Sequence, residues 1–287
     1  MARTPAALVE AALKDLLDKK AMKKNSLLTL ALLLRLVPAP AAAWYAWNPA
    51  VVYAFAGAAH FDSLMLLALT GAALTLHRAE GRLGWQVVSV SCLGAAIALK
   101  LVPVFLLPVW GFALGARAWL LAVSVALPAA LALPFGGTRV VLEPLRAFAD
   151  VTRFNELLVW VFPNPWQRNW PVTLLLCTTV LVLVWHLRRD WPRSALWVLG
   201  AALILSPVLH PWYVTWILPF AVWRQQPAWT VLSLSALAAF LLWETTPLWT
   251  AWQPNLLTRA FVCVPPLIAW RWQSAISNQQ SDEPAHR

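Results

Sequence analysis

Nine residues with side chains able to do chemistry lie near the ends of apolar stretches in this chain. They are His60, Asp62, Lys100, Arg153, Asn155, Glu156, His210, Trp212 and Tyr213. A carboxylate such as Asp62 or Glu156 can take the proton from an attacking hydroxyl group, while a cation such as Lys100 or Arg153 can neutralise a departing phosphate. Gathered at a membrane surface, these residue types suit transfer of a sugar from a lipid-phosphate donor.

The composition requires a membrane to surround the elements that would position these residues. Of 287 residues, 61% are hydrophobic and only 12% are charged, and 20 are Trp. A soluble domain of this size could not bury so much apolar surface. We therefore predict an all-α polytopic transmembrane bundle with about ten membrane segments, several of them short. The clearest are Leu64–Leu76, Leu83–Leu99, Ala118–Leu133, Val172–Leu187, Ala195–Leu209, Thr230–Trp243 and Leu256–Trp270.

The charged residues predict how the chain is divided and oriented. Residues 1–25 read as a cytoplasmic amphipathic surface helix, residues 26–272 as the transmembrane domain, and residues 273–287 as a disordered cytoplasmic tail. The first membrane segment is expected to run from Ser26 to Trp47. With the N-terminus in the cytoplasm, fifteen of the 22 Lys and Arg residues lie inside, as the positive-inside rule requires. Both termini are then cytoplasmic, and residues 136–170 form a long outer loop with a helix lying on the membrane.

This topology places all nine residues on the outer face, although each has a simpler explanation. Asp62 could cap the helix that follows it, and Lys100 could extend to the lipid headgroups. His210 could mark a turn before aromatic residues at the interface. Arg153, Asn155 and Glu156 could form the wet side of a surface helix. Because ionisable groups near a membrane are costly, their presence on one face together favours a functional site.

Four stretches also resemble a known family. They are Trp47–Ser63, which contains His60-Phe-Asp62, then Ala98–Pro108 around Lys100, Arg153-Phe-Asn-Glu156, and Leu205–Pro219, which contains His210-Pro-Trp-Tyr213. In order and spacing they resemble integral-membrane glycosyltransferases of the GT-C superfamily, particularly bacterial mannosyltransferase-like members that use polyprenyl-phosphate sugars. The resemblance covers roughly residues 45–220.

The resemblance implies transfer of a hexose, mannose above all, from a polyprenyl-phosphate donor to a glycan or glycolipid acceptor on the outer face of a bacterial plasma membrane. Asp62 or Glu156 would be the catalytic base, and the other seven residues would bind substrate. Such enzymes carry a catalytic acid on a large first external loop, whereas this chain has no acidic residue between Pro38 and Phe61. An N-terminally shortened or non-catalytic member is therefore one alternative, and a lipid or solute transporter is another.

Cofactors and other partners are predicted to be few. No tight cluster of carboxylates has metal-ligand spacing, so we expect no resident metal or cofactor, and a divalent ion is an alternative that no motif supports. Cys92, Cys177 and Cys263 fall inside apolar segments, which predicts buried free thiols. The net charge of +10 follows the topology and favours contact with membrane lipids. No continuous basic patch on a soluble face suggests nucleic acid.

Overall fold

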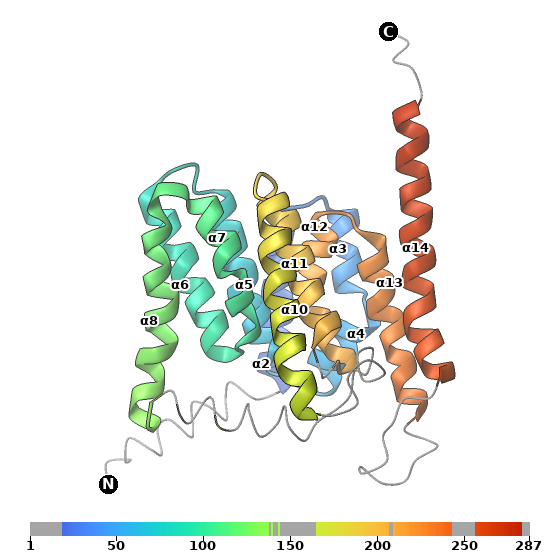
Figure 1. The fold of residues 1–287 in the computed structure, drawn as a ribbon, viewed down its shortest axis with the longest axis horizontal. Coiled ribbons are helices and arrows are strands. Elements are labelled where there is room, and N and C mark those ends of the chain that lie inside the picture. Colours follow the sequence, from blue (N-terminus) through green and yellow to red (C-terminus); the bar gives the residue numbers. More distant parts are fainter. Residues whose placement is uncertain are drawn as a thin grey trace.

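A computed structural model describes residues 19–137, 165–206, 209–242 and 256–282, together with residues 139 and 143. Within these residues the chain contains twelve α-helices, several short 3-10 or π-helical pieces and no strand. The helices form one bundle, with α14 at its edge reaching beyond the others (Figure 1). The predicted all-α class is confirmed.

The first helices run up and down between two ends of the bundle. They are α2 (Lys19–Leu33), α3 (Ala39–Ala46), α4 (Pro49–Val51), the π-helix η1 (Val52–Gly57), α5 (Asp62–His77) and α6 (Leu83–Leu99). Helix α2 runs parallel to α5, as two contacts show. Ser63 at the start of α5 donates to Met22 Sδ over 3.1 Å, and Gly71 farther along α5 lies near Leu32. Helix α6 returns antiparallel to α5.

A hairpin of apolar helices follows and packs on α6. Its pieces are η2 (Val102–Leu106), α7 (Leu107–Leu114), η3 (Gly115–Leu120), α8 (Leu121–Ala132) and η4 (Leu133–Phe135). The chain reverses at Gly115, whose φ of +58° is a conformation that favours glycine. Helix α8 crosses α6 closely enough that a Cβ on Gly94 would lie 3.0 Å from Ser124 Cα. Such approach needs a residue without a side chain.

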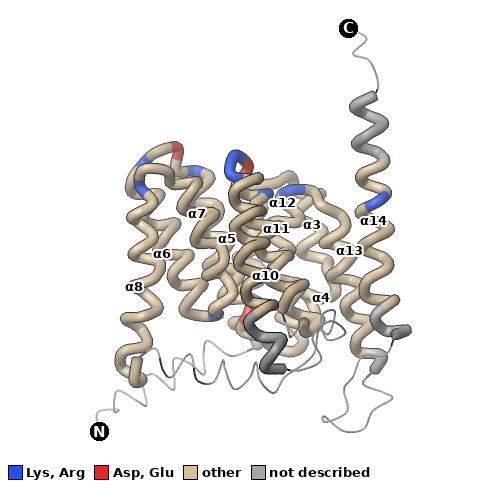
Figure 2. The backbone as a smooth tube through the Cα atoms, viewed as in Figure 1, with Lys and Arg blue, Asp and Glu red and all other residues tan. Residues whose placement is uncertain are grey.

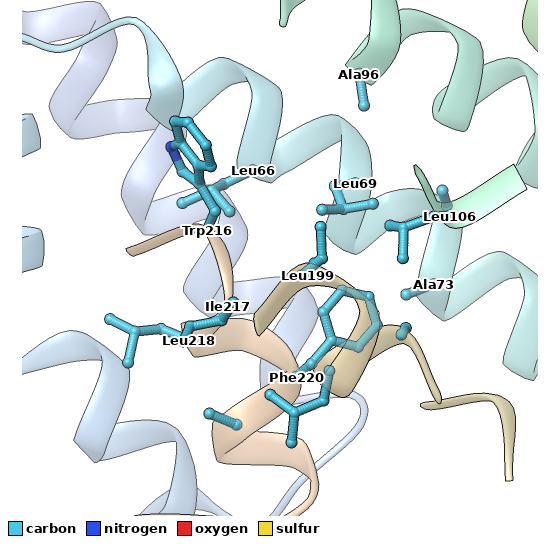
Figure 3. Close-up of a cluster of buried hydrophobic side chains, with 14 of the residues drawn as sticks. Leu66, Leu69, Ala73, Ala96, Leu106, Leu199, Trp216, Ile217, Leu218 and Phe220 are labelled. Atoms are coloured by element: carbon cyan, nitrogen blue, oxygen red, sulfur yellow. The ribbon is translucent and has the colours of Figure 1, made fainter. Parts of the chain in front are cut away.

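The remaining helices complete the bundle. They are α10 (Pro165–His186), α11 (Trp191–Leu205), the 3-10 helix η5 (Pro211–Trp216), α12 (Leu218–Trp223), α13 (Pro227–Ser235), η6 (Ala236–Leu242) and α14 (Leu256–Asp282). Proline recurs in the first turn of these elements, where its missing N–H costs nothing. Leu66 and Leu69 of α5 share a buried cluster with Leu199 of α11 and Trp216 of η5 (Figure 3).

The two ends of the bundle differ in charge. We call the end with Asp62 and Lys100 the site end. The opposite end, here the arginine end, holds the turns between helices that carry Arg35, Arg78, Arg82, Arg188, Arg189 and Arg224. Figure 2 shows blue and red segments concentrated along that end. At the arginine end Arg117 links η3 to the turn before α6 and to α6 itself, by donating to Gly81 O and to Gln86 Oε1.

Several boundaries differ from the sequence predictions. Residues 26–47 do not form one span, because the chain turns at residues 34–38 and α3 runs back. Residues 19–25 belong to the packed helix α2, with Met22 and Asn25 buried, rather than to a surface helix that ends at residue 25. Helix α10 begins at Pro165, inside the predicted outer loop, and α14 continues to Asp282, inside the predicted disordered tail. The rest of residues 1–25 and most of the outer loop lie outside the described residues.

The direction of α2 shows that the predicted sorting of Lys and Arg between the two ends is partly wrong. Lys23 and Lys24 lie beside Met22, whose contact with Ser63 puts them at the site end, whereas the predicted topology grouped them with Arg78 and Arg82. None of the three cysteines forms a disulfide, as expected, but Cys177 is exposed and Cys92 and Cys263 are only partly buried, because each lies on a helix with one exposed side.

One stretch of consecutive helices has the length and hydropathy of a membrane span. Among the described helices, only the 34-residue stretch Val102–Phe135 is long and apolar enough to cross a membrane, with a mean hydropathy of 2.0 over an 18-residue window. This stretch is the hairpin that reverses at Gly115. Five other apolar helices have 10–17 residues, so the prediction of about ten spans is not confirmed by helix length.

Candidate functional site

Three segments far apart in the sequence meet at the site end. The first is the loop from Ala58 to Phe61 with the first turn of α5, the second is Lys100 after α6, and the third is Leu209 through Trp216. Before the first segment the chain widens into the π-helix η1, a rare form that is frequently found at functional sites. Ala59 then takes a φ of +56°, which turns the chain so that His60 N–H donates to Ala54 O over 2.8 Å.

A buried ion pair lies at the centre of this end. Lys100 Nζ donates to Asp62 Oδ1 over 2.6 Å, and Trp216 Nε1 donates to the same oxygen over 2.7 Å. The Asp62 side chain is 1% exposed and that of Lys100 is 18% exposed. A pair this dry depends on both members, because removing one leaves a buried charge without a partner, at a cost of about 3–5 kcal/mol.

Aromatic rings surround the ammonium group. Lys100 Nζ lies 4.3 Å from the ring centroids of both Tyr213 and Trp216, and 5.3 Å from that of Phe61. Tyr213 and Trp216 stack with their centroids 4.1 Å apart, since residues three apart lie on the same side of a 3-10 helix. Cation–π attraction therefore adds to the ion pair in holding Lys100 inside the protein.

Two imidazoles border the aromatic cluster. The rings of His60 and His210 each stack on Trp212 with centroids 4.4 Å apart, and His210 meets the ring of Tyr213 edge-on at 5.0 Å. These contacts occupy the Trp212 ring with protein groups. Trp212 consequently links the first and third segments of the site end.

The surroundings keep both imidazoles neutral at physiological pH. Burial is the largest cause that lowers the pKa of His210 to about 4; the charges of Lys100 and His60 add to the lowering, and Asp62 opposes it. Burial also lowers the pKa of His60, against the opposing charge of Asp62. For Lys100 the pKa is lowered by burial and partly restored by the attraction of Asp62. A neutral imidazole beside a carboxylate and a cation can accept a proton or a hydrogen bond.

The carboxylate of Asp62 is used on one side only. Both of its hydrogen bonds from the described residues end on Oδ1, so Oδ2 has no donor in this part of the chain. An acceptor oxygen of this kind, beside a held cation, can receive a hydroxyl proton while the cation faces an anion.

Six of the nine predicted residues come together here: His60, Asp62, Lys100, His210, Trp212 and Tyr213. Arg153, Asn155 and Glu156 lie outside the described residues. The capping explanation for Asp62 is wrong, since Phe61 occupies the N-cap position of α5 and no side chain caps it. Lys100 does not extend to headgroups either, because its ammonium is turned inward onto Asp62.

Sequence reasoning missed Phe61 and Trp216. Trp216 had a detectable signal: it follows Tyr213 by three residues in a segment that begins with His210-Pro, a spacing that places the two rings together on a tight helix. Phe61 had none, because an aromatic residue between His60 and Asp62 looks like an ordinary interfacial side chain.

The described part of the chain contains no group of three or more His, Cys, Asp or Glu side chains able to hold a metal ion. Comparisons with protein-family models, with curated proteins and with solved structures found no match.

Proposed function

We propose that this chain is a multi-pass membrane protein. Its surface supports this, because many large apolar side chains are exposed while several small polar side chains are buried beside the apolar core. Exposed residues include Val125, Leu131, Leu174, Leu181, Phe261, Leu267 and Ile268, whereas Thr29, Ser63, Thr70, Ser89, Ser124, Ser194 and Ser233 are buried. Water would penalise that distribution and lipid favours it. A helix of 17 residues such as α6 spans about 25 Å, close to the hydrocarbon thickness of about 30 Å.

The proposed orientation puts the arginine end in the cytoplasm. Short turns set orientation most strongly. The short turns at the arginine end carry Arg35, Arg78, Arg82, Arg188, Arg189 and Arg224. The short turns between described helices at the site end carry Lys100. Helix α2 then begins outside and α14 ends inside. Single cysteines at Lys24 and Arg189, in a chain without its native cysteines, should be labelled from opposite sides of the membrane. Labelling of both from one side would contradict this path for α2.

We further propose that the site end transfers a sugar from a polyprenyl-phosphate donor. The acceptor hydroxyl would attack the anomeric carbon, its proton would pass to Asp62 Oδ2, and the bond from that carbon to the phosphate oxygen would break. The lipid phosphate keeps the electron pair, and Lys100 would stabilise its charge. A hexose, with mannose preferred, and a glycan or glycolipid acceptor follow from the family resemblance, and Glu156 of the outer loop is the other carboxylate for the base role.

One observation carries this proposal. Of the four stretches that resemble the glycosyltransferases, three have a place in the structure, and all three meet around the Asp62–Lys100 pair. Stretches that matched by chance would have no reason to share one end of the bundle. Their meeting point also holds the carboxylate, cation and aromatic groups that the chemistry requires.

The same geometry favours a second candidate, a non-catalytic membrane protein in which the pair only holds helices together. Asp62 is 1% exposed, and a buried pair joining α5 to the end of α6 needs no substrate to explain it. The two candidates differ in what happens when the charge is removed without loss of folding.

Sugar transfer in membranes tests the proposal. With a labelled polyprenyl-phosphate mannose donor, Asp62→Asn should lose at least about a hundredfold in rate, since Asn cannot accept the proton. The matched control is Asp190→Asn at the arginine end, which should transfer normally. Absence of transfer by the unaltered chain with both polyprenyl-phosphate mannose and polyprenyl-phosphate glucose would favour the non-catalytic candidate.

A further inference from the structure

Trp216 touches both members of the central ion pair. Its indole N–H donates to Asp62 Oδ1 over 2.7 Å, and its ring centroid lies 4.3 Å from Lys100 Nζ. Among the described side chains, only Lys100 and Trp216 donate hydrogen bonds to the Asp62 carboxylate. Phe61 and Tyr213 lie with their rings near Lys100 but do not bond to Asp62. Within the described part of the chain, Trp216 is thus the one side chain that contacts both the Asp62 carboxylate and the Lys100 ammonium group.

We infer that Trp216 is a positioning residue for the Asp62–Lys100 pair. By holding the pair, Trp216 directs Asp62 Oδ2 and the Lys100 ammonium group toward the reacting atoms. This role rests on the proposed transfer reaction. A carboxylate with one bound oxygen can still rotate about its side-chain bonds. A second donor on Oδ1 limits that rotation, and so leaves Oδ2 in one place for a substrate hydroxyl.

The fold holds Trp216 firmly enough for this task. The residue is 3% exposed and shares the buried cluster with Leu66, which follows Asp62 by one turn of α5 (Figure 3). Tyr213 stacks on its ring from the preceding turn of η5. A donor that is packed on both sides has few rotamers open to it, so its N–H direction is set before substrate binds.

The chain provides a matched control in Trp110. This residue is 0% exposed, and its Nε1 donates to Ser89 Oγ over 2.9 Å in another part of the bundle. Trp216→Phe and Trp110→Phe both remove one buried indole donor and a similar volume. Any general cost of losing a buried Trp therefore appears in both variants, whereas loss of positioning appears only in Trp216→Phe.

The first readout does not depend on activity. The intact protein is treated with a small amine-acylating reagent, and modification of Lys100 is measured by mass spectrometry relative to the exposed Lys23 and Lys24. We expect Trp216→Phe to raise the relative labelling of Lys100 by about threefold, because the pair loses one constraint, and Trp216→Leu to raise it more, because the ring face is lost as well. Trp110→Phe should leave it unchanged.

The second readout is transfer from polyprenyl-phosphate mannose. Trp216→Phe should lower kcat by about tenfold with little change in donor KM, as expected when a reacting group is misplaced rather than a binding contact removed. Equal Lys100 labelling and equal kcat in Trp216→Phe and Trp110→Phe would overturn the inference. Altered labelling, with no transfer by the unaltered chain, would support the hold on the pair and reject the proposed reaction instead.

Discussion

Two aspartates pair with cations over the same distance at opposite ends of the bundle, in different surroundings. Asp62 and Lys100 lie 2.6 Å apart with side-chain exposures of 1% and 18%, while Asp190 and Arg224 lie 2.6 Å apart with exposures of 34% and 37%. Asp190 also caps α11 by accepting from Arg193 N–H over 3.2 Å. Its role is explained by the helix that it begins.

The difference shows that distance alone says little about what an ion pair does. Water screens the Asp190–Arg224 pair, so it contributes at most about 1 kcal/mol. Around Asp62 and Lys100 the protein has replaced water with Phe61, Tyr213 and Trp216. A fold that needed only a link between helices would be at least as stable with apolar residues there, so the retained charges are consistent with a chemical use.

The two ion pairs should differ most in how much they contribute to stability. Lys100→Met should lower the free energy of unfolding by about 3–5 kcal/mol, because it leaves the Asp62 carboxylate buried without its partner. Arg224→Met should lower it by about 1 kcal/mol or less. Denaturant unfolding of the purified protein in detergent micelles measures both. Equal losses in the two variants would mean that the site-end pair is wetted like the other.

Removing both charges separates structure from chemistry at the site end. The double variant Asp62→Asn/Lys100→Gln should recover most of the stability that either single change loses, since no charge is left buried alone. Its sugar transfer should remain at least about a hundredfold below that of the unaltered chain. Recovery of transfer together with stability would show that the pair serves only to hold the helices.

The stability of the folded protein should depend on pH through a histidine at the site end. The pKa of His210 is lowered to about 4 by burial, while an unfolded histidine titrates near pH 6.5. Between these values the unfolded chain binds more protons, so stability should fall as the pH is lowered from about 6.5 to about 4. His210→Gln should flatten this dependence. His186→Gln, which changes an exposed residue at the arginine end, should not. Melting temperatures measured across this pH range test both variants, and equal slopes would contradict the assignment.

The sequence predicted local helices far better than the path between them. The stretch 83–99 was placed correctly, and 64–76 lies within the observed helix Asp62–His77, because each is a continuous apolar run with clear limits. The pattern of residues 26–47 predicts one span broken at Pro38 and Pro40, whereas the chain turns at residues 34–38 and the eight residues of α3 run back and pack against α12. That packing is a long-range contact, which no local pattern encodes.

The sequence predicted which residues gather at the site, but not how they contact one another. The polar residues His60, Asp62, Lys100 and His210 stand out in an apolar chain, so their grouping at one end could be anticipated from alternating segments. That Asp62 would pair with Lys100, and that Trp216 would join them, depends on how α5, α6 and η5 approach one another. Apolar periodicity does not specify such approach.

The site end, and not the arginine end, should receive the polyprenyl-phosphate donor. A polyprenyl phosphate carrying a photoreactive group beside the phosphate, irradiated with the protein in membranes and mapped by mass spectrometry, tests it directly. Crosslinks should fall on the segments around His60–Asp62, Lys100 and His210–Trp216, and unlabelled polyprenyl phosphate should compete for them. Crosslinks confined to the arginine-bearing turns at 78–82 and 187–190, or equally abundant with a phosphate-free probe, would contradict the account.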